Sequence, residues 1–126
     1  MSCKQQALEN AGGAAADTSL DTVFEDIDIT KAKELMEKQP SLVLVDVRTP
    51  EEIAAGKIGN ALEIDYSAPD FAQKISELDK NTPYLVYCAA GGRSKSAMEQ
   101  MKQSGFTHVY NLTDGYNGWA QSGQTR

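Results

Sequence analysis

The sequence predicts a small α/β domain in which a mainly parallel sheet is flanked by helices on both faces. Two observations predict this fold. Short apolar runs alternate with amphipathic stretches, and the two strongest runs are continuously apolar, as is typical of parallel strands buried on both faces. The 126 residues, 40% of them hydrophobic and 24% charged, suit one globular domain. We expect a flexible tail over 1–22, the domain over 23–123 and a short tail over 124–126.

The first half of the domain contains two predicted strands and two predicted helices. The run "VFEDI" (23–27) predicts an edge strand, and "TKAKELMEKQ" (30–39) predicts a helix with Thr30 as a candidate cap. The branched run "SLVLVDV" (41–47) is the strongest strand signal. Thr-Pro-Glu-Glu at 49–52 then predicts a capping box with proline at the first helical position.

The second half continues the alternation. Its expected elements are, in order, a short strand "ALEI" (61–64), a helix "PDFAQKISEL" (69–78), a buried strand "YLVY" (84–87), a helix "RSKSAMEQMKQSG" (93–105) ended by Gly105, a strand "HVYNL" (108–112) and a turn at Asp114-Gly115 before a segment that holds Trp119. Ligands of such sheets bind at the carboxyl ends of the strands. Cys88 follows one of these ends directly.

The residues after Cys88 favour a reactive thiolate. Gly91 and Gly92 allow positive φ, so successive backbone N–H groups can turn toward one point. A helix that starts near Arg93 directs its free N–H groups toward the same point, and the guanidinium adds a fixed positive charge. Such surroundings lower a cysteine pKa and make the sulfur nucleophilic. The alternative is that Cys88 is a small buried hydrophobic residue beside a plain turn.

Two separated segments resemble single-domain rhodaneses, which are sulfurtransferases. These segments are "LVDVRTPEEIAAGKIGNALEI" and "YLVYCAAGGRSKSAMEQMKQSGFTHVYNLTDGYNGW", and the resemblance runs from about Phe24 to Gly123. It implies a loop cysteine that takes sulfane sulfur from thiosulfate or a persulfide donor. The cysteine, as a persulfide, then passes that sulfur to a thiophilic acceptor such as cyanide, a thiol or a protein.

The resemblance also implies roles for individual residues. Cys88 corresponds to the persulfide-carrying cysteine, and Arg93 is expected to act with it. The predicted substrate-binding loop consists of Ala89, Ala90, Gly91, Gly92 and Ser94. Asp46 and Arg48 correspond to the Asp-x-Arg of the family and are expected to support the site, Asp46 by binding loop amides and Arg48 by pairing with Glu51 or Glu52.

The chain departs from the pattern of many relatives in places. It reads Gly-Lys-Ile-Gly-Asn-Ala at 56–61 where they read Gly-His-Ile-Pro-Gly-Ala, and Asp114-Gly115 replaces a common Gly-Gly. These changes affect local geometry and partner surfaces more than the reaction. Arg93 is the one charged side chain of the loop, which makes a persulfide an alternative donor to thiosulfate.

Other functions fit the sequence less well. Phosphatase and arsenate-reductase loops place five residues between cysteine and arginine, whereas four separate Cys88 from Arg93, and Ser94 stands where the arginine would be needed. A non-catalytic sulfur-sensing or protein-binding module is the main alternative. The net charge of -6 disfavours nucleic acid. With two cysteines, one histidine (His108, in a strand-like run) and no CxxC, neither a metal site nor a cofactor is expected.

Cys3 raises the question of location. It precedes a polar, Ala/Gly-rich stretch, and this arrangement resembles a mature bacterial lipoprotein whose signal peptide was replaced by a cloning start. In that interpretation a lipid on Cys3 tethers a monomeric domain at the cell envelope or in the periplasm. The alternative is a free cysteine near a disordered cytoplasmic N-terminus.

Overall fold

The structure is a computed structural model that describes residues 22–122. Cys3, the expected N-terminal tail as far as residue 21 and the expected C-terminal tail at 124–126 therefore lie outside the described residues. Within them, five strands form one sheet in which each neighbouring pair is parallel. The strands, in sheet order, are β2 (Val23–Ile27), β6 (His108–Leu112), β5 (Tyr84–Tyr87), β3 (Val43–Asp46) and β4 (Leu62–Glu63). The prediction of a mainly parallel sheet, with its first strand at an edge, is confirmed.

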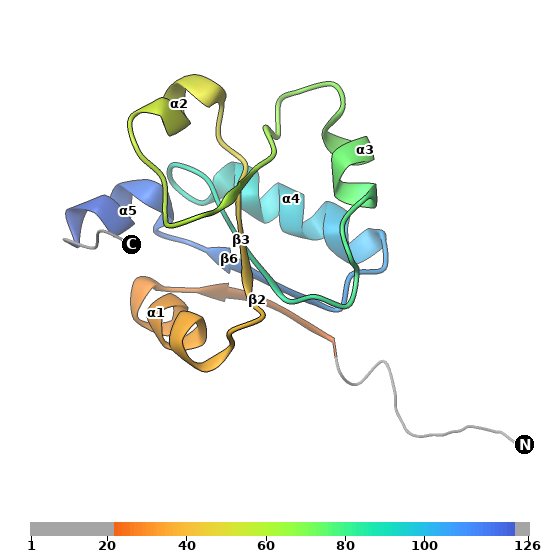
Figure 1. Ribbon diagram of the computed structural model, residues 1–126, viewed down its shortest axis with the longest axis horizontal. Coiled ribbons are helices and arrows are strands. Elements are labelled where there is room, and N and C mark those ends of the chain that lie inside the picture. Colours follow the sequence, from red (N-terminus) through yellow and green to blue (C-terminus); the bar gives the residue numbers. More distant parts are fainter. Residues whose placement is uncertain (1–21, 123–126) are drawn as a thin grey trace, which may run out of the picture.

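Helices cover both faces of this sheet (Figure 1). They are α1 (Ile29–Lys38), α2 (Pro50–Ala54), α3 (Phe71–Ser76), α4 (Gly92–Gln103) and α5 (Gly115–Gln121). One buried cluster joins the sheet to α3 and α4, and a second joins its other face to α1 and α5. Strand β5 contributes to both, because Val86 faces the first cluster and Tyr87 the second. Cys88 continues this alternation and is buried on the α4 face.

Most element boundaries agree with the prediction, and one helix cap does not. The capping box at Thr49 and Glu52 is present, with Pro50 in the first turn. In contrast, α1 begins one residue before Thr30, and its cap is Asp28, whose side chain accepts a hydrogen bond from the Lys31 N–H at 2.9 Å. The segment after Asp114 that was expected only to hold Trp119 forms α5, and the indole is buried.

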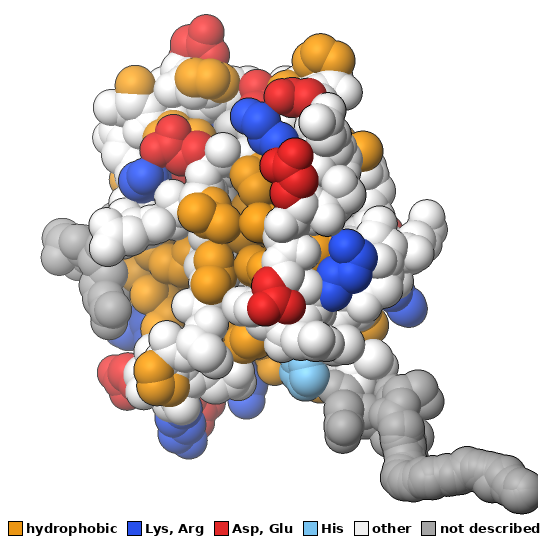
Figure 2. All heavy atoms as spheres, turned by 45° about the vertical axis from the view of Figure 1, so that its right-hand side comes forward, with side chains coloured by type: hydrophobic (Ala, Val, Ile, Leu, Met, Phe, Trp, Pro, Cys, Tyr) orange, Lys and Arg blue, Asp and Glu red, His pale blue; other side chains and the backbone are white. Residues whose placement is uncertain are grey.

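Hydrophobic side chains gather in the middle of one face of the molecule (Figure 2). An open hollow of about 220 Å³ lies where β3 and β4 form the end of the sheet, lined by Leu42, Val43, Leu44, Asn60 and Leu62. Leu62 is the one exposed large hydrophobic residue of the described chain. No helix within residues 22–122 is long and apolar enough to cross a membrane.

The position of the α1 cap can be tested by two alanine substitutions. Asp28→Ala removes the acceptor for the Lys31 N–H, so we expect it to lower the free energy of unfolding by about 1 kcal/mol. Thr30→Ala, inside the helix, serves as the matched control and should change stability by less than half of that. Urea unfolding followed by circular dichroism measures both. A larger loss for Thr30→Ala would contradict the Asp28 cap.

Candidate active site

The loop after β5 places Cys88 beneath the first turn of α4. Gly91 adopts a φ of +100° and caps the helix, which begins at Gly92. The sequence prediction that both glycines use positive φ is therefore half right, because Gly92 is helical. Gly91 is needed for a second reason: a side chain there would overlap the Thr113 carbonyl. The turn thus requires glycine at 91 and tolerates a side chain at 92.

The Cys88 sulfur is surrounded by hydrogen-bond donors. The Gly91 N–H donates to Sγ at 3.1 Å, and the Ser94 hydroxyl lies 3.5 Å from it. Burial of Cys88 alone would raise the pKa of its thiol, but the Ser94 hydroxyl and the backbone N–H groups of Ser94, Ala90 and Gly91 lower that pKa below its ordinary value. The loop therefore stabilises the thiolate form, which is the nucleophilic one.

The loop is anchored from below by the start of α5. The Tyr116 N–H donates to the Cys88 carbonyl at 2.7 Å, and the Asn117 N–H donates to the Ala89 carbonyl at 3.1 Å. Gly115, with a φ of +63°, lies so close that a Cβ there would overlap the peptide between Ala89 and Ala90. These contacts fix the carbonyl groups of the loop, so that its N–H groups remain directed at the sulfur.

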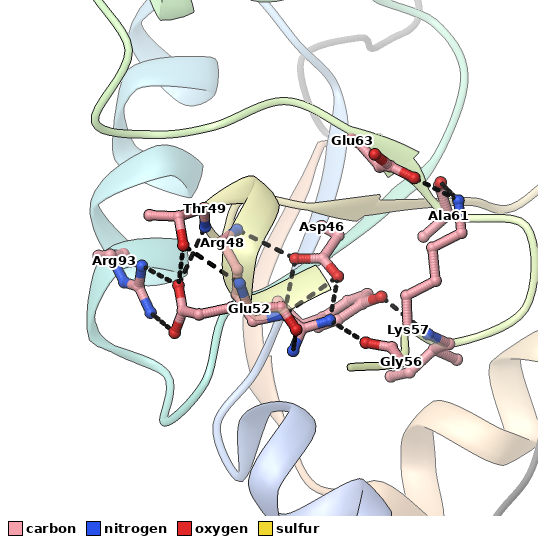
Figure 3. Close-up of polar contacts among 11 residues, drawn as sticks. Asp46, Arg48, Thr49, Glu52, Gly56, Lys57, Ala61, Glu63 and Arg93 are labelled. Carbon is pink, nitrogen blue, oxygen red and sulfur yellow. Dashed lines mark hydrogen bonds and ion pairs between the residues drawn. The ribbon is translucent and has the colours of Figure 1, made fainter. Parts of the chain in front are cut away.

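Arg93 is held by a carboxylate rather than left free above the loop. Its guanidinium donates two hydrogen bonds to Glu52, from Nη1 at 2.8 Å and from Nη2 at 3.0 Å (Figure 3). The same Glu52 closes the capping box, because Oε1 also accepts from the Thr49 N–H at 2.9 Å. The Arg93 hydrogen bonds are the largest cause that lowers the pKa of Glu52 to about 2. The pair therefore stays ionised at any pH well above that value.

Asp46 and Arg48 form a buried ion pair at the end of β3. Arg48 is only 3% exposed, and its Nε and Nη2 donate to the Asp46 carboxylate at 2.9 Å and 2.6 Å. Nη2 also donates to the Gly56 carbonyl at 2.6 Å, and the guanidinium lies 4.2 Å from the centre of the Tyr116 ring. The expected pairing of Arg48 with Glu51 or Glu52 is wrong, since the side chain of Glu52 binds Arg93. The expected contact of Asp46 with loop amides is limited to the Arg48 N–H at 3.0 Å.

The structure brings most of the predicted site residues together. Cys88, the loop residues 89–92 and Ser94 form one compact group, and Arg93 lies beside it with its guanidinium paired to Glu52. Asp46 and Arg48 lie next to β5, and their side chains bind each other and the Gly56 carbonyl rather than the sulfur. Asn111, a buried residue of β6 that accepts a hydrogen bond from Ser94 at 2.5 Å, was not among the predicted site residues. No sequence signal marks it, because the contact depends on β6 lying beside β5.

Comparison with known proteins gives a consistent result. The sequence model of the "Rhodanese-like domain" family matches residues 28–122. A sulfurtransferase of Allochromatium vinosum is 34% identical over 101 residues, which cover 80% of this chain and 92% of that protein. The thiosulfate sulfurtransferase GlpE of Pseudomonas putida is 37% identical, covering 76% and 84%. The crystal structure of a rhodanese-related protein from Thermoplasma volcanium is similar with a TM-score of 0.67 and 31% identity, covering 79% and 93%.

The contact between α5 and the loop can be tested at Gly115. We expect Gly115→Ala to lower the free energy of unfolding by about 2 kcal/mol, because alanine combines a strained φ with an overlap against the Ala89 carbonyl. The displaced loop should also slow alkylation of Cys88 by iodoacetamide at neutral pH. Gly92→Ala is the matched control for stability, since nothing lies within 4 Å of the added Cβ. Equal stability of the two variants would contradict the anchoring role of Gly115.

Proposed function

Because this chain belongs to the rhodanese-like family and is a rhodanese-type sulfurtransferase, we propose that Cys88 carries the transferred sulfur as a persulfide. The observation that supports this most directly is the set of donors around its sulfur, with the Gly91 N–H at 3.1 Å and the Ser94 hydroxyl at 3.5 Å. These donors stabilise the thiolate before loading. The same loop offers N–H groups to the anionic outer sulfur after it.

The proposed reaction has two steps. The Cys88 thiolate attacks the sulfane sulfur of the donor, so that a new S–S bond forms. With thiosulfate, the bond between the two donor sulfurs breaks, its electron pair leaves on sulfite, and the cysteine becomes a persulfide anion. An acceptor such as cyanide or a thiolate then attacks the outer sulfur, which releases the Cys88 thiolate. With cyanide the product is thiocyanate, and charge is conserved in each step.

The charges around the loop bear on the choice of donor. Both arginines of the described chain are paired with carboxylates, Arg93 with Glu52 and Arg48 with Asp46. A dianion such as thiosulfate therefore meets backbone N–H groups rather than a free cation, and it approaches a chain of net charge -6. A low-molecular-weight or protein persulfide, which carries less charge at the sulfur, fits such a site better. We propose a persulfide as the preferred donor and thiosulfate as a poorer one.

We also propose that the domain acts as a monomer tethered at the cell envelope through a lipid on Cys3. The support for this is the sequence alone, since Cys3 is followed by a polar, Ala/Gly-rich stretch before the first strand. The mass of the mature N-terminal peptide, isolated from cells that express the full natural gene, tests the proposal. An unlipidated natural Met1 would reject it.

Intact mass spectrometry tests whether Cys88 carries sulfur. After incubation with thiosulfate or with a persulfide donor, the protein should gain one sulfur atom, and cyanide should remove it. Cys88→Ser should gain none, whereas the matched Cys3→Ser variant should load normally. If neither donor loads the folded protein, the persulfide role is wrong and the non-catalytic binding module becomes the better interpretation.

Glu52→Gln tests the effect of the Arg93 pair on donor choice. Glutamine can keep the capping box but removes the negative charge that neutralises Arg93. We expect the KM for thiosulfate to fall by about twofold to fivefold, as is typical of a partly exposed ion pair, while a persulfide donor responds less. Glu51→Gln removes an equal charge from the same helix without a contact to Arg93 and is the control. An unchanged KM in Glu52→Gln would reject this account of donor choice.

A further inference from the structure

A chain of hydrogen bonds connects the Cys88 sulfur to a surface ion pair on the edge strand. Ser94 lies 3.5 Å from the sulfur and donates to Oδ1 of Asn111 at 2.5 Å. Nδ2 of Asn111 donates to Asp26 at 3.0 Å, and Asp26 pairs with Lys95 at 2.8 Å. Ser94 and Asn111 are 0% and 1% exposed, so water cannot readily replace either partner.

The orientation of the Asn111 amide follows from its neighbours. Nδ2 faces two groups that can only accept, the Asp26 carboxylate at 3.0 Å and the Gly91 carbonyl at 3.4 Å. Oδ1 must therefore face Ser94. Two oxygens at 2.5 Å need a proton between them, and the Ser94 hydroxyl is the group that supplies it. In this arrangement the Ser94 proton lies mainly on the hydrogen bond to Asn111, and the contact of the same hydroxyl with the sulfur at 3.5 Å is the weaker of the two.

The single Ser94 proton can serve only one acceptor fully at a time. A free Cys88 thiolate attracts that proton in addition to the backbone N–H groups, and taking it leaves the buried Oδ1 of Asn111 without a donor, which costs free energy. In a thiol or a persulfide the Sγ atom is neutral and a weak acceptor. The proton can then remain on the hydrogen bond to Asn111. The free thiolate is thus the one state in which the network is in conflict.

We propose that Asn111, oriented by Asp26, is a positioning residue that competes with the Cys88 sulfur for the Ser94 proton and thereby favours the sulfur-loaded cysteine over the free thiolate. The part that concerns loading rests on the proposed persulfide role of Cys88. Three strands and one helix take part, because Asp26 lies in β2, Asn111 in β6, Cys88 at the end of β5 and Ser94 in α4.

The charged groups near the sulfur must stay constant in the test. The first pair is Arg93 of α4, which interacts with Cys88, and Glu52 of α2, which binds Arg93. The second is the Asp26–Lys95 pair, which is connected to the sulfur through Asn111 and Ser94. Asn111→Leu leaves all four in place. Leucine has nearly the shape of asparagine but neither accepts nor donates, so the substitution removes the competitor for the proton together with the Nδ2 hydrogen bonds to Asp26 and the Gly91 carbonyl.

The first measurement is the pH dependence of Cys88 alkylation by iodoacetamide in the reduced full chain, with Cys3→Ser as the background of every variant. Asn111→Leu should lower the thiol pKa by about one unit, because Ser94 is then free to donate to the thiolate. Ser94→Ala should raise it. The double variant should match Ser94→Ala, since no proton is left to compete for. An unchanged or raised pKa in Asn111→Leu, or an equal shift without Ser94, would overturn the proposal.

The second measurement is the loading equilibrium at a fixed ratio of thiosulfate to sulfite, read by intact mass. The ratio of loaded to free Asn111→Leu protein should fall about tenfold relative to the parent. An unchanged ratio would overturn the part of the proposal that concerns loading. If the parent protein never loads with thiosulfate or a persulfide donor, the proposed function is wrong, and so is the part of the proposal that concerns loading. The alkylation profile still decides the competition for the proton.

Surface variants keep the test available if Asn111→Leu does not fold. Asp26→Ala removes the acceptor that orients the Asn111 amide, so the amide can turn its N–H groups toward Ser94. The pKa of Cys88 should then fall, as in Asn111→Leu. Lys95→Ala is the matched control, because Lys95 contacts Asp26 but not Asn111, and it should leave the alkylation profile unchanged. An equal shift of the Cys88 pKa in both variants would indicate a general effect of surface charge, and it would overturn the orienting role of Asp26.

Discussion

The backbone contact between the Cys88 loop and the start of α5 is the constraint on which the rest of the site depends. The Tyr116 and Asn117 N–H groups donate hydrogen bonds to the loop carbonyls, and the absence of a side chain at Gly115 permits this close approach. With the carbonyls fixed below, the N–H groups of the loop converge on the sulfur above. The activation of the thiol therefore rests on the backbone N–H groups of the loop together with the Ser94 hydroxyl.

The charged side chains around the loop are arranged as pairs that support one another. Arg48 binds Asp46 and donates to the backbone carbonyls of Glu52 and Gly56. Glu52 is further fixed by the Thr49 cap, and in turn it holds Arg93. A buried pair at the end of β3 thus determines, through α2, where the positive charge of α4 lies. The charged side chains around the loop largely neutralise one another, so the site offers little net positive charge to an anion.

Much of this architecture was predictable because the signals for it lie within short stretches of the sequence. Continuous apolar runs identified the parallel strands, and the Thr-x-x-Glu spacing identified the capping box before α2. The predicted cap at Thr30 was wrong, because the Asp28 side chain two residues earlier accepts from the Lys31 N–H and starts the helix at Ile29. Partners distant in sequence could not be predicted. Glu52 and Arg93 are 41 residues apart, and Asn111 reaches Ser94 only through the strand order of the sheet.

The pairing of β2 with β6 has a consequence for how the chain matures. Asp26 and Asn111 are 85 residues apart, so the first described strand finds its partner only after nearly the whole domain has been synthesised. Contacts of such long sequence separation form late, because the loop they close is entropically costly. In a nascent chain that has made Cys88 but not α5, the contacts that fix the carbonyls of the loop have no donors yet. The arrangement of N–H groups around the sulfur therefore depends on residues that are synthesised after it.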